Sequence, residues 1–321
     1  MGTVSEPAST ALVPAPAYRH EAFLYEGMDA FLEGTLRFVD QAVARDEPVL
    51  VVVSEPKIKA LSAALGVASE GVSFADMADV GRNPGRIIAA WRDFVDSAAS
   101  SGRGVHGIGE PVSFERSPAE LVECQHHESL LNVAFRSDDF RLMCPYDVST
   151  LSQAIIDEAR RSHPYLFGPL RSCPSTGFAG SGELSEWRQA PLPEPPGWAS
   201  ILVLTGSEDL TRVRAFVARH AVGAGLTSRR IEDVVLAANE MATNSLRYGG
   251  GRVEVRLWSE GDSLLLDFSD QGHIEEPMVG RYRPAPDGLG GRGFWLANHL
   301  CDLVQIRSSE SGTVVRLHAY I

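Results

Sequence analysis

A segment rich in proline, glycine and serine divides the chain near its middle. It runs from Gly168 to Trp198 and includes four prolines between positions 191 and 196. Such a composition disfavours helices and sheet interiors and is typical of a linker between folded units. At 321 residues the chain is also longer than a usual single domain. We therefore predict a disordered tail, a first domain, a linker and a second domain at residues 1–19, 20–166, 167–199 and 200–321.

The composition is that of an ordinary globular protein, with 44% hydrophobic and 22% charged residues. The formal net charge of −13 would repel phosphate backbones, so we expect no direct nucleic-acid partner. No apolar run reaches the length of a membrane span, and the four cysteines are widely spaced without a CxxC pair. We therefore expect a cytoplasmic protein with no membrane contact and with reduced thiols. The cysteine spacing signals neither a disulfide framework nor a zinc site.

Residues 20–166 alternate between helical and strand patterns, which is typical of an α/β fold. The apolar run 49–53 follows Pro48 and predicts a buried parallel strand. Apolar periodicity predicts further strands at 72–75, 105–108 and 141–144, and helices at 31–42, 58–65, 84–99 and 118–131. The first domain is therefore predicted to be an α/β domain built on a parallel sheet.

Residues 200–321 combine helices with alternating strands. A strand at 201–204 precedes two amphipathic helices, for which Ser207 and Ser228 are the expected N-caps. Strands at 253–258 and 264–268 are joined by a turn at Gly261-Asp262 and should pair in antiparallel fashion. A loop containing glycine and proline then leads to a helix at 294–301 and to strands at 303–307 and 313–317.

The second of these helices carries Glu240 and Asn244, which are four residues apart and therefore share one helix face. A carboxylate beside an amide oxygen suits a site that holds a hard cation and phosphate oxygens. Glycine loops follow at Asp270-Gln271-Gly272 and at 288–293. The plainer alternatives are a solvated helix face and ordinary glycine-containing turns, but the order and spacing of the three motifs favour a site.

These three motifs resemble the N box and the two glycine boxes of the GHKL ATPase superfamily, in particular its RsbW-like anti-sigma-factor serine kinases. The resemblance implies a Bergerat fold, in which helices cover a mixed, mainly antiparallel sheet, and it implies ATP and Mg²⁺ as cofactors. By this resemblance, Asn244 would supply an oxygen to Mg²⁺, and Glu240 would orient or deprotonate the attacking hydroxyl or water. Asp270 would accept a hydrogen bond from the adenine amino group.

The glycines have roles that the same resemblance implies. Gly272 would let the backbone pass close to the base. The second glycine box leads into a helix, whose N-terminus and loop amides would surround the phosphates, and we expect this role for Gly288, Gly290, Gly291, Arg292 and Gly293. The chain departs from the family pattern at Tyr248, where many relatives have histidine, and at His273, where many have a further glycine. Neither departure removes a metal ligand.

The first domain resembles the MEDS sensory domain, named for methanogen, methylotroph and DcmR-type sensors. This resemblance rests on segments such as His20 to Tyr25, the run 49–53, 107–111 and 144–147. It implies a RecA-like fold, but the segment after the first buried strand, residues 54–57, lacks the GxxxxGK[ST] pattern and should not bind nucleotide in the manner of a P-loop. Together the two domains resemble RsbA-family anti-sigma regulatory proteins.

Two features of the first domain invite a binding role. Glu110 follows a strand end between glycine and proline, where α/β ligand sites tend to form, although a turn carboxylate explains it equally well. A metal or ligand-sensing role is also conceivable for His20, His106, Cys124, His126 and His127. The last three lie on one predicted helix but diverge in direction, so we favour packing or polar intramolecular roles.

The leading hypothesis is a signal-responsive anti-sigma regulator with an ATP-dependent serine/threonine kinase domain, which phosphorylates a STAS-type anti-sigma antagonist or binds a sigma factor. The alternative is a module that binds ATP but acts by sequestration alone. A sensor histidine kinase is less favoured, because His127-Glu128 lacks the proline of an H box and no helical hairpin precedes the ATPase domain. The resemblance implies a homodimer. The sensed signal and the partner proteins do not follow from the sequence.

Overall fold

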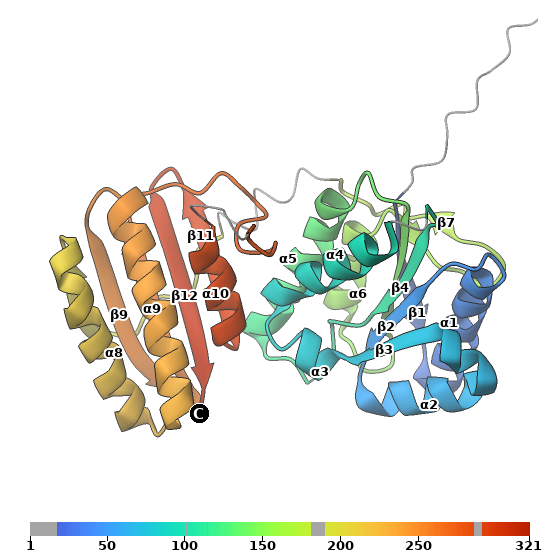
Figure 1. Ribbon diagram of the computed structural model, residues 1–321, viewed down its shortest axis with the longest axis horizontal. Helices are drawn as coiled ribbons and strands as arrows, with labels where there is room; N and C mark the ends of the chain where they lie inside the picture. The colour runs from blue at the N-terminus through green and yellow to red at the C-terminus, as the bar shows by residue number, and fades with distance from the viewer. Residues whose placement is uncertain (1–17, 100–101, 114, 181–189, 286–290) are drawn as a thin grey trace, which may run out of the picture.

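The computed structural model describes residues 18–99, 102–113, 115–180, 190–285 and 291–321. These residues form two α/β bodies that lie side by side, with the C-terminal body on the left of Figure 1 and the N-terminal body on the right. Residues 1–17 of the predicted tail (1–19) and the two glycines Gly288 and Gly290 lie outside the described residues. The last two residues of that predicted tail belong to the folded domain, because Tyr18 is buried and Arg19 begins the first strand. Among the described helices, none is both long and apolar enough to cross a membrane.

The N-terminal domain is built on a seven-stranded sheet in the order β3-β2-β4-β5-β1-β6-β7. The strands pair in parallel from β3 to β6, and only β7 runs antiparallel to its neighbour. The apolar run predicted as a buried parallel strand is β2, which pairs in parallel with β3 and β4. The strands are β1 (Arg19–Tyr25), β2 (Val49–Val53), β3 (Val72–Asp76), β4 (Val105–Gly109), β5 (Phe140–Asp147), β6 (Tyr165–Leu166) and β7 (Cys173–Pro174).

Helices cover both faces of this sheet. Phe31 and Phe38 of α1 and Leu61 of α2 belong to one buried cluster, whereas Trp91 of α4 and Leu130 of α5 belong to another. Two separate apolar layers are the expected consequence of a parallel sheet that is buried on both sides. The helices are α1 (Gly27–Val43), α2 (Glu55–Leu65), α3 (Met77–Val80), α4 (Ile87–Ala98), α5 (Pro118–Ala134) and α6 (Gln153–Ser162).

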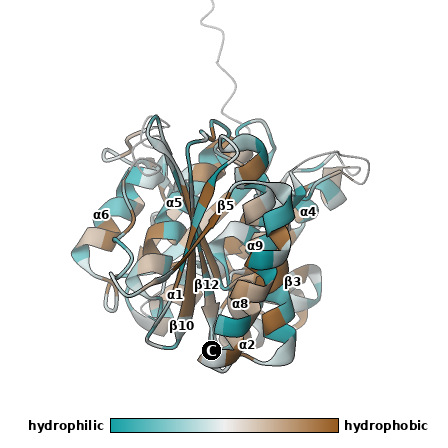
Figure 2. Cartoon of the chain, turned by 90° about the vertical axis from the view of Figure 1, so that its left-hand side faces the viewer, coloured by the Kyte–Doolittle hydropathy of each residue, from teal (hydrophilic) through white to brown (hydrophobic). Residues whose placement is uncertain are grey.

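The C-terminal domain has a five-stranded sheet in the order β11-β12-β10-β9-β8, and each of these pairings is antiparallel. The strands are β8 (Ser200–Leu204), β9 (Val253–Glu260), β10 (Ser263–Asp270), β11 (Leu303–Ser309) and β12 (Gly312–Tyr320). The helices are α8 (Leu210–Ala224), α9 (Ser228–Tyr248) and α10 (Arg292–Leu300). Figure 2 shows hydrophobic and hydrophilic residues alternating along α8 and α9, as expected for amphipathic helices that cover one face of a sheet.

The two predicted helix caps in this domain were wrong. Ser207 starts a 3-10 turn, Ser207–Asp209, that precedes α8. Ser228 is already helical, and the N-cap of α9 is Thr227, whose side chain accepts a hydrogen bond from the Arg230 amide. Adjacent hydroxyl residues at 227 and 228 both suit a cap, and only the extended backbone of Thr227 decides between them.

The described end of the linker lies on the other face of this sheet. Arg316 of β12 donates hydrogen bonds to Asp267 of β10 and to the carbonyl oxygen of Pro193, with the latter at 2.8 Å. Ala199 packs with Trp258 and Leu265 in a small buried cluster. The linker therefore covers part of the second sheet and is not a free tether in this region.

Buried polar residues join the two domains. Glu123 of α5 lies 2.9 Å from the guanidinium of Arg307 on β11. Burial opposes ionisation of Glu123, but the neighbouring His126 and the charge of Arg307 outweigh it and lower the pKa of the carboxyl to about 2. Asn83 donates to the carbonyl oxygen of Asn298 at 3.1 Å. A buried charge with a fixed partner in the other domain holds the domains in a defined orientation.

Candidate functional site

Helix α9 presents Glu240 and Asn244 at the rim of the C-terminal core. Its apolar side, which includes Ala238, Met241 and Ala242, is buried against the sheet. Glu240 and Asn244 are only half-buried, and within the described residues no hydrogen bond or ion pair engages either side chain. Their polar groups are therefore held in place by the helix and remain available to a ligand.

The start of α10 lies directly against these two side chains. A Cβ atom on Gly293 would be 2.7 Å from the Asn244 amide nitrogen and 3.4 Å from a carboxylate oxygen of Glu240. A Cβ atom at position 293 would push the Asn244 amide aside, so glycine lets α10 approach these two side chains in their present positions. The N-cap of α10 is Gly291, which has a left-handed backbone with φ 81°. The structure thus brings the N box and the end of the second glycine box together.

The first glycine box lies at the C-terminal end of α9. Asp270 ends β10, and one of its carboxylate oxygens accepts a hydrogen bond of 2.8 Å from the Gly272 amide. A Cβ atom on Gly249, which ends α9, would lie 2.3 Å from the Asp270 carboxyl carbon. A Cβ atom on Gly272 would approach the Tyr248 carbonyl oxygen to 2.8 Å. Both glycines therefore allow the Asp270 turn to pack tightly against the end of α9.

Thr313 is a member of this site that the sequence analysis missed. It lies opposite Asp270 in the register of β10 and β12. Its buried hydroxyl donates to the Gly272 carbonyl oxygen at 2.8 Å and so fixes the first glycine box to β12. No motif marks this threonine, and only the pairing register of two distant strands could have identified it.

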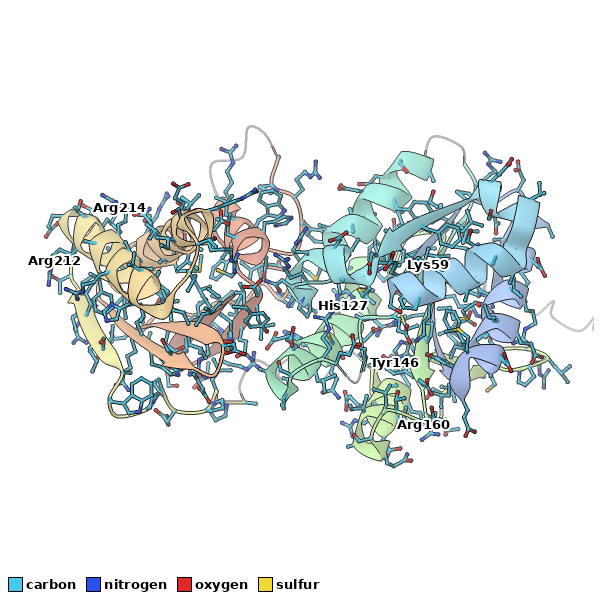
Figure 3. The ribbon with its side chains drawn as sticks, turned by 90° about the horizontal axis from the view of Figure 1, so that it is seen from below. Lys59, His127, Tyr146, Arg160, Arg212 and Arg214 are labelled. Atoms are coloured by element: carbon cyan, nitrogen blue, oxygen red, sulfur yellow. The ribbon has the colours of Figure 1, made fainter. Side chains whose placement is uncertain are left out.

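The remaining predicted residues lie at the start of α10 or beside the N box. Gly291 and Arg292 are exposed at the helix start, whereas Gly288 and Gly290 precede it outside the described residues. Asn239, the first residue of the N box, accepts a hydrogen bond of 2.9 Å from Arg214 of α8. Figure 3 labels Arg214 at the outer side of the C-terminal domain. Asn239 therefore links α9 to α8, and the site-facing pair is Glu240 and Asn244.

Glu110 lies beside a large cavity at the carboxyl ends of the N-terminal strands. Its carboxylate accepts hydrogen bonds of 2.8 Å from Tyr25 and 2.5 Å from Lys57. Burial raises the pKa of Glu110, against the opposing charge of Lys57. The cavity has a volume of about 900 Å³ and is lined by residues of both domains, including Arg230 and Tyr320.

The five residues considered for metal binding in the first domain do not meet in one place within the part of the chain that the structure describes. The ring of His106 lies 3.2 Å from Glu47, and the Cys124 thiol donates to the Pro111 carbonyl oxygen. His126 lies beside Glu123, and His127, labelled in Figure 3, is buried on α5. His20 alone joins a group of metal-type donors, together with Glu128, Cys144 and His163.

The two domains match two families. Residues 19–164 match the MEDS domain, the methanogen/methylotroph, DcmR sensory domain. Residues 205–319 match the histidine kinase-like ATPase domain. The chain therefore carries a MEDS domain followed by a histidine kinase-like ATPase domain, and both resemblances inferred from the motifs are confirmed.

More specific relatives resemble the C-terminal domain. Over 116 residues the chain is 29% identical to the anti-sigma F factor of Clostridium acetobutylicum, a match that covers 33% of this chain and 81% of the relative. A solved structure of the RsbU and RsbW domains of Rv1364c from Mycobacterium tuberculosis aligns with 19% identity and a TM-score of 0.28. That alignment covers 38% of this chain and only 32% of the other, and a likeness of this size supports no conclusion about function.

Proposed function

We propose that this protein is an anti-sigma regulator whose C-terminal domain binds Mg-ATP and phosphorylates a serine or threonine of a partner protein. The observation that supports this most strongly is the approach of Gly293 to Glu240 and Asn244, which unites the N box with the second glycine box. The similarity to an anti-sigma F factor over 81% of that relative supports the same assignment.

The residues at the site fit Mg-ATP. The amide oxygen of Asn244 is a suitable ligand for Mg²⁺, and the backbone amides at the start of α10 are suitable donors to phosphate oxygens. Asp270 keeps one carboxylate oxygen on the Gly272 amide, which leaves the other for the adenine amino group. When bound, Mg-ATP supplies the phosphoryl group for transfer and the metal charge that neutralises the phosphates.

Glu240 has the catalytic role in this proposal. It stands one helical turn from Asn244 and beside Gly293, so its carboxylate faces the same space as the start of α10. A carboxylate oxygen of Glu240 would accept the proton of the partner's hydroxyl while holding that hydroxyl toward the phosphates. The Asn244 and Asp270 side chains bind and orient, and they exchange no proton.

The partners follow from the proposed role. A STAS-type anti-sigma antagonist would supply the hydroxyl group, and a sigma factor would bind the same domain when the antagonist is phosphorylated. We further propose that the ATPase domain forms a homodimer and that the protein acts in the cytoplasm, where sigma factors meet RNA polymerase.

We propose that the N-terminal domain regulates this site through the segment 273–285, which follows Gly272 and leads toward the second glycine box. Met278 of this connecting segment packs into the buried cluster of the N-terminal domain. Arg281 donates to the Pro84 carbonyl oxygen at 3.1 Å. Asn298 of α10 donates to the Gly280 carbonyl oxygen and receives a hydrogen bond from Asn83. A change in the N-terminal domain would therefore move both the connecting segment and α10.

We propose the cavity beside Glu110 as the place where the N-terminal domain binds its signal. It lies at the carboxyl edge of the parallel sheet, the usual ligand position in such folds. Because Arg230 and Tyr320 of the ATPase domain also line it, a ligand there would contact both domains. Its carboxylate and ammonium groups, on Glu110 and Lys57, favour a small polar ligand over a purely apolar one.

The test is transfer of labelled γ-phosphate from ATP to a purified STAS-type antagonist encoded beside the gene for this chain or its relatives. Wild type should label the antagonist, and Glu240→Gln should reduce the rate by at least about 100-fold, a typical loss for a catalytic base. Glu232→Gln is the matched control, because Glu232 is an exposed carboxylate on the same helix. If wild type binds Mg-ATP but labels no antagonist or sigma factor, sequestration replaces the kinase proposal.

A further inference from the structure

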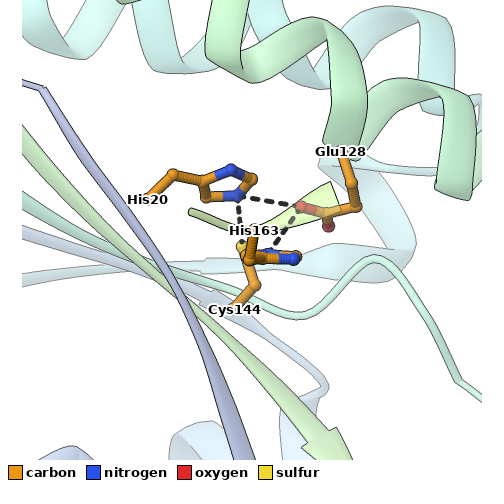
Figure 4. A group of neighbouring side chains, drawn as sticks. All are labelled: His20, Glu128, Cys144 and His163. Carbon is orange, nitrogen blue, oxygen red and sulfur yellow. Dashed lines mark hydrogen bonds and ion pairs between the residues drawn. The ribbon is translucent and has the colours of Figure 1, made fainter. Parts of the chain in front are cut away.

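Four donor side chains converge inside the N-terminal domain, from four separate elements. His20 comes from β1, Glu128 from α5, Cys144 from β5, and His163 from the residue after α6. Their ligand atoms all lie within 4.8 Å of one another. Figure 4 shows the four side chains converging on one point. Each of the four residues is at most 1% exposed. A buried group of this kind is uncommon, because ionisable side chains are seldom buried without a partner that balances their charge.

The spacing of the donors suits a single small ion. His20 Nε2 lies 3.0 Å from Glu128 Oε2 and 3.4 Å from Cys144 Sγ. His163 Nε2 lies 3.3 Å from the same glutamate oxygen. A tetrahedral Zn²⁺ with ordinary bond lengths separates its ligand atoms by roughly 3.3–3.8 Å. Three of the six separations are thus within about 0.3 Å of this range, and the other three are at most 4.8 Å.

Hydrogen bonds fix the proton of His20 on the ring nitrogen that faces away from the cluster. Asn132 donates from its amide nitrogen to the Ser162 carbonyl oxygen at 2.7 Å, so its own oxygen must face His20. That oxygen lies 3.1 Å from His20 Nδ1. Nδ1 is therefore the donor, and the neutral ring of His20 presents an unprotonated Nε2 to the cluster.

A hydrogen bond also fixes the position of the ring proton of His163. Its Nδ1 lies 2.8 Å from the Ala159 carbonyl oxygen, which can only accept a hydrogen bond. The neutral ring therefore also presents an unprotonated Nε2 to the cluster, where this atom has no hydrogen-bond partner among the described residues. Outer hydrogen bonds that set the tautomer of a histidine in this way are typical of metal ligands.

The charges balance only with a divalent cation if all four groups act as ligands. Two neutral imidazoles, one carboxylate and one thiolate carry a total charge of about −2, which Zn²⁺ would neutralise. In the alternative without a metal ion, one of the two imidazoles would be protonated at Nε2 and would donate to Glu128. The Nε2 of the other imidazole would then face the same carboxylate oxygen with no proton between the two atoms. The oxygen Oε1 of Glu128 also lacks a hydrogen-bond partner among the described residues.

We propose that His20, Glu128, Cys144 and His163 bind one Zn²⁺ in a closed, tetrahedral site. Four protein ligands leave no open position, so the ion has a structural role and catalyses no reaction. The ion connects β1 and β5 to α5. Helix α5 also carries Glu123, which lies at the domain boundary. This site is independent of the nucleotide site in the other domain.

The first experiment measures metal binding by the full-length protein, purified without a histidine tag and stripped with a chelator. Titration with Zn²⁺ against a chromophoric chelator should give one tight site per chain. Titration with Co²⁺ should give a thiolate-to-cobalt charge-transfer band and the intense visible bands of tetrahedral cobalt. If the folded wild type binds neither ion, or binds Co²⁺ without the thiolate band, the proposal is wrong and the four groups share a proton instead.

The second experiment compares two cysteine variants of the same domain. Cys144→Ser should weaken Zn²⁺ binding by more than about 100-fold, since even outer-shell changes commonly cost 10-fold to 100-fold. Cys124→Ser is the matched control, because Cys124 is equally buried but donates its thiol proton to the Pro111 carbonyl oxygen. It should keep the wild-type affinity and the thiolate band. Retention of both by Cys144→Ser would overturn the proposal, and circular dichroism establishes that each variant is folded.

Discussion

The two domains place their chemically active side chains in opposite ways. In the N-terminal domain, His20 and Glu128 are at most 1% exposed and belong to a closed group, in which Asn132 orients the His20 ring. In the C-terminal domain, Glu240 and Asn244 are half-buried on a helix rim next to Gly293. A closed set of donors suits a resident ion, whereas an open face suits a ligand that enters and leaves. Burial of the donors thus separates the proposed structural site from the proposed exchangeable one.

The largest expected effect is on the free energy of unfolding, when the site carboxylate of each domain, Glu128 or Glu240, is removed. Glu128→Ala should lower the free energy of unfolding by about 3 kcal/mol, because it leaves buried polar groups without their partner. Glu240→Ala should change it by less than about 0.5 kcal/mol, because its carboxylate is half-buried and stabilises little. Hydrogen exchange resolved by domain measures both changes. Equal destabilisation by the two variants would remove the distinction between the domains.

The contact between the domains should respond to loss of its buried charge. Glu123→Gln should destabilise the assembly of the two domains by about 2 kcal/mol, because Arg307 loses a charged partner. Calorimetry should then show the two domains unfolding more independently. Asp93→Asn is the control, since its ion pair with Arg283 is exposed and should contribute less than about 0.5 kcal/mol. Identical melting curves for both variants would show that Glu123 does not join the domains.

Gly293, in the first turn of α10, should contribute to nucleotide affinity. Gly293→Ala places a methyl group against Asn244 and should weaken ATP binding by about 10-fold, equivalent to roughly 1.4 kcal/mol of strain. Gly223→Ala is the control, because Gly223 lies in α8 with open space around its Cα. Fluorescent nucleotide titration compares the two variants. Unchanged affinity in Gly293→Ala would mean that α10 does not border the nucleotide.

A smaller effect should appear in the pH dependence of stability. Burial, together with the charge of Arg316, lowers the pKa of His318 to about 4. Because the unfolded chain binds the proton more readily, this histidine's contribution is present above pH of about 6.5 and is lost as pH falls toward 4. The loss between pH 7 and roughly 5.5 should be on the order of 1 kcal/mol. Urea unfolding of His318→Gln should show a shallower pH dependence than wild type, and parallel curves would contradict this.

The contrast between the domains also explains what the sequence could predict. Glu240 and Asn244 are four residues apart on one helix, so local spacing identified the pair before the structure did. The glycine boxes were recognisable by their order along the chain. The contacts that unite them, such as the approach of Gly293 to Asn244, depend on helix packing and could only be expected by resemblance.

The buried cluster of the N-terminal domain could not be predicted in the same way. Its members are distant in sequence, and Glu128, Cys144 and His163 belong to no recognisable spacing pattern. Only the order of the parallel strands, which places β1 beside β5, brings His20 next to Cys144. Apolar periodicity does not predict strand β1, because the buried polar residues His20 and Glu21 interrupt its apolar run. Local periodicity does not predict which distant strands pair with each other.

We propose that ATP binds at the C-terminal site through a magnesium ion held by Asn244. Isothermal titration calorimetry with ATP, in Mg²⁺ and in EDTA, tests it for wild type and for Asn244→Ala. Wild type should bind ATP at least about 10-fold more tightly with Mg²⁺ than without it, since each 1.4 kcal/mol of metal contact is a factor of 10. The Asn244→Ala variant should lose this difference. Equal binding by wild type in both buffers, or an undiminished Mg²⁺ effect in the variant, would contradict the account.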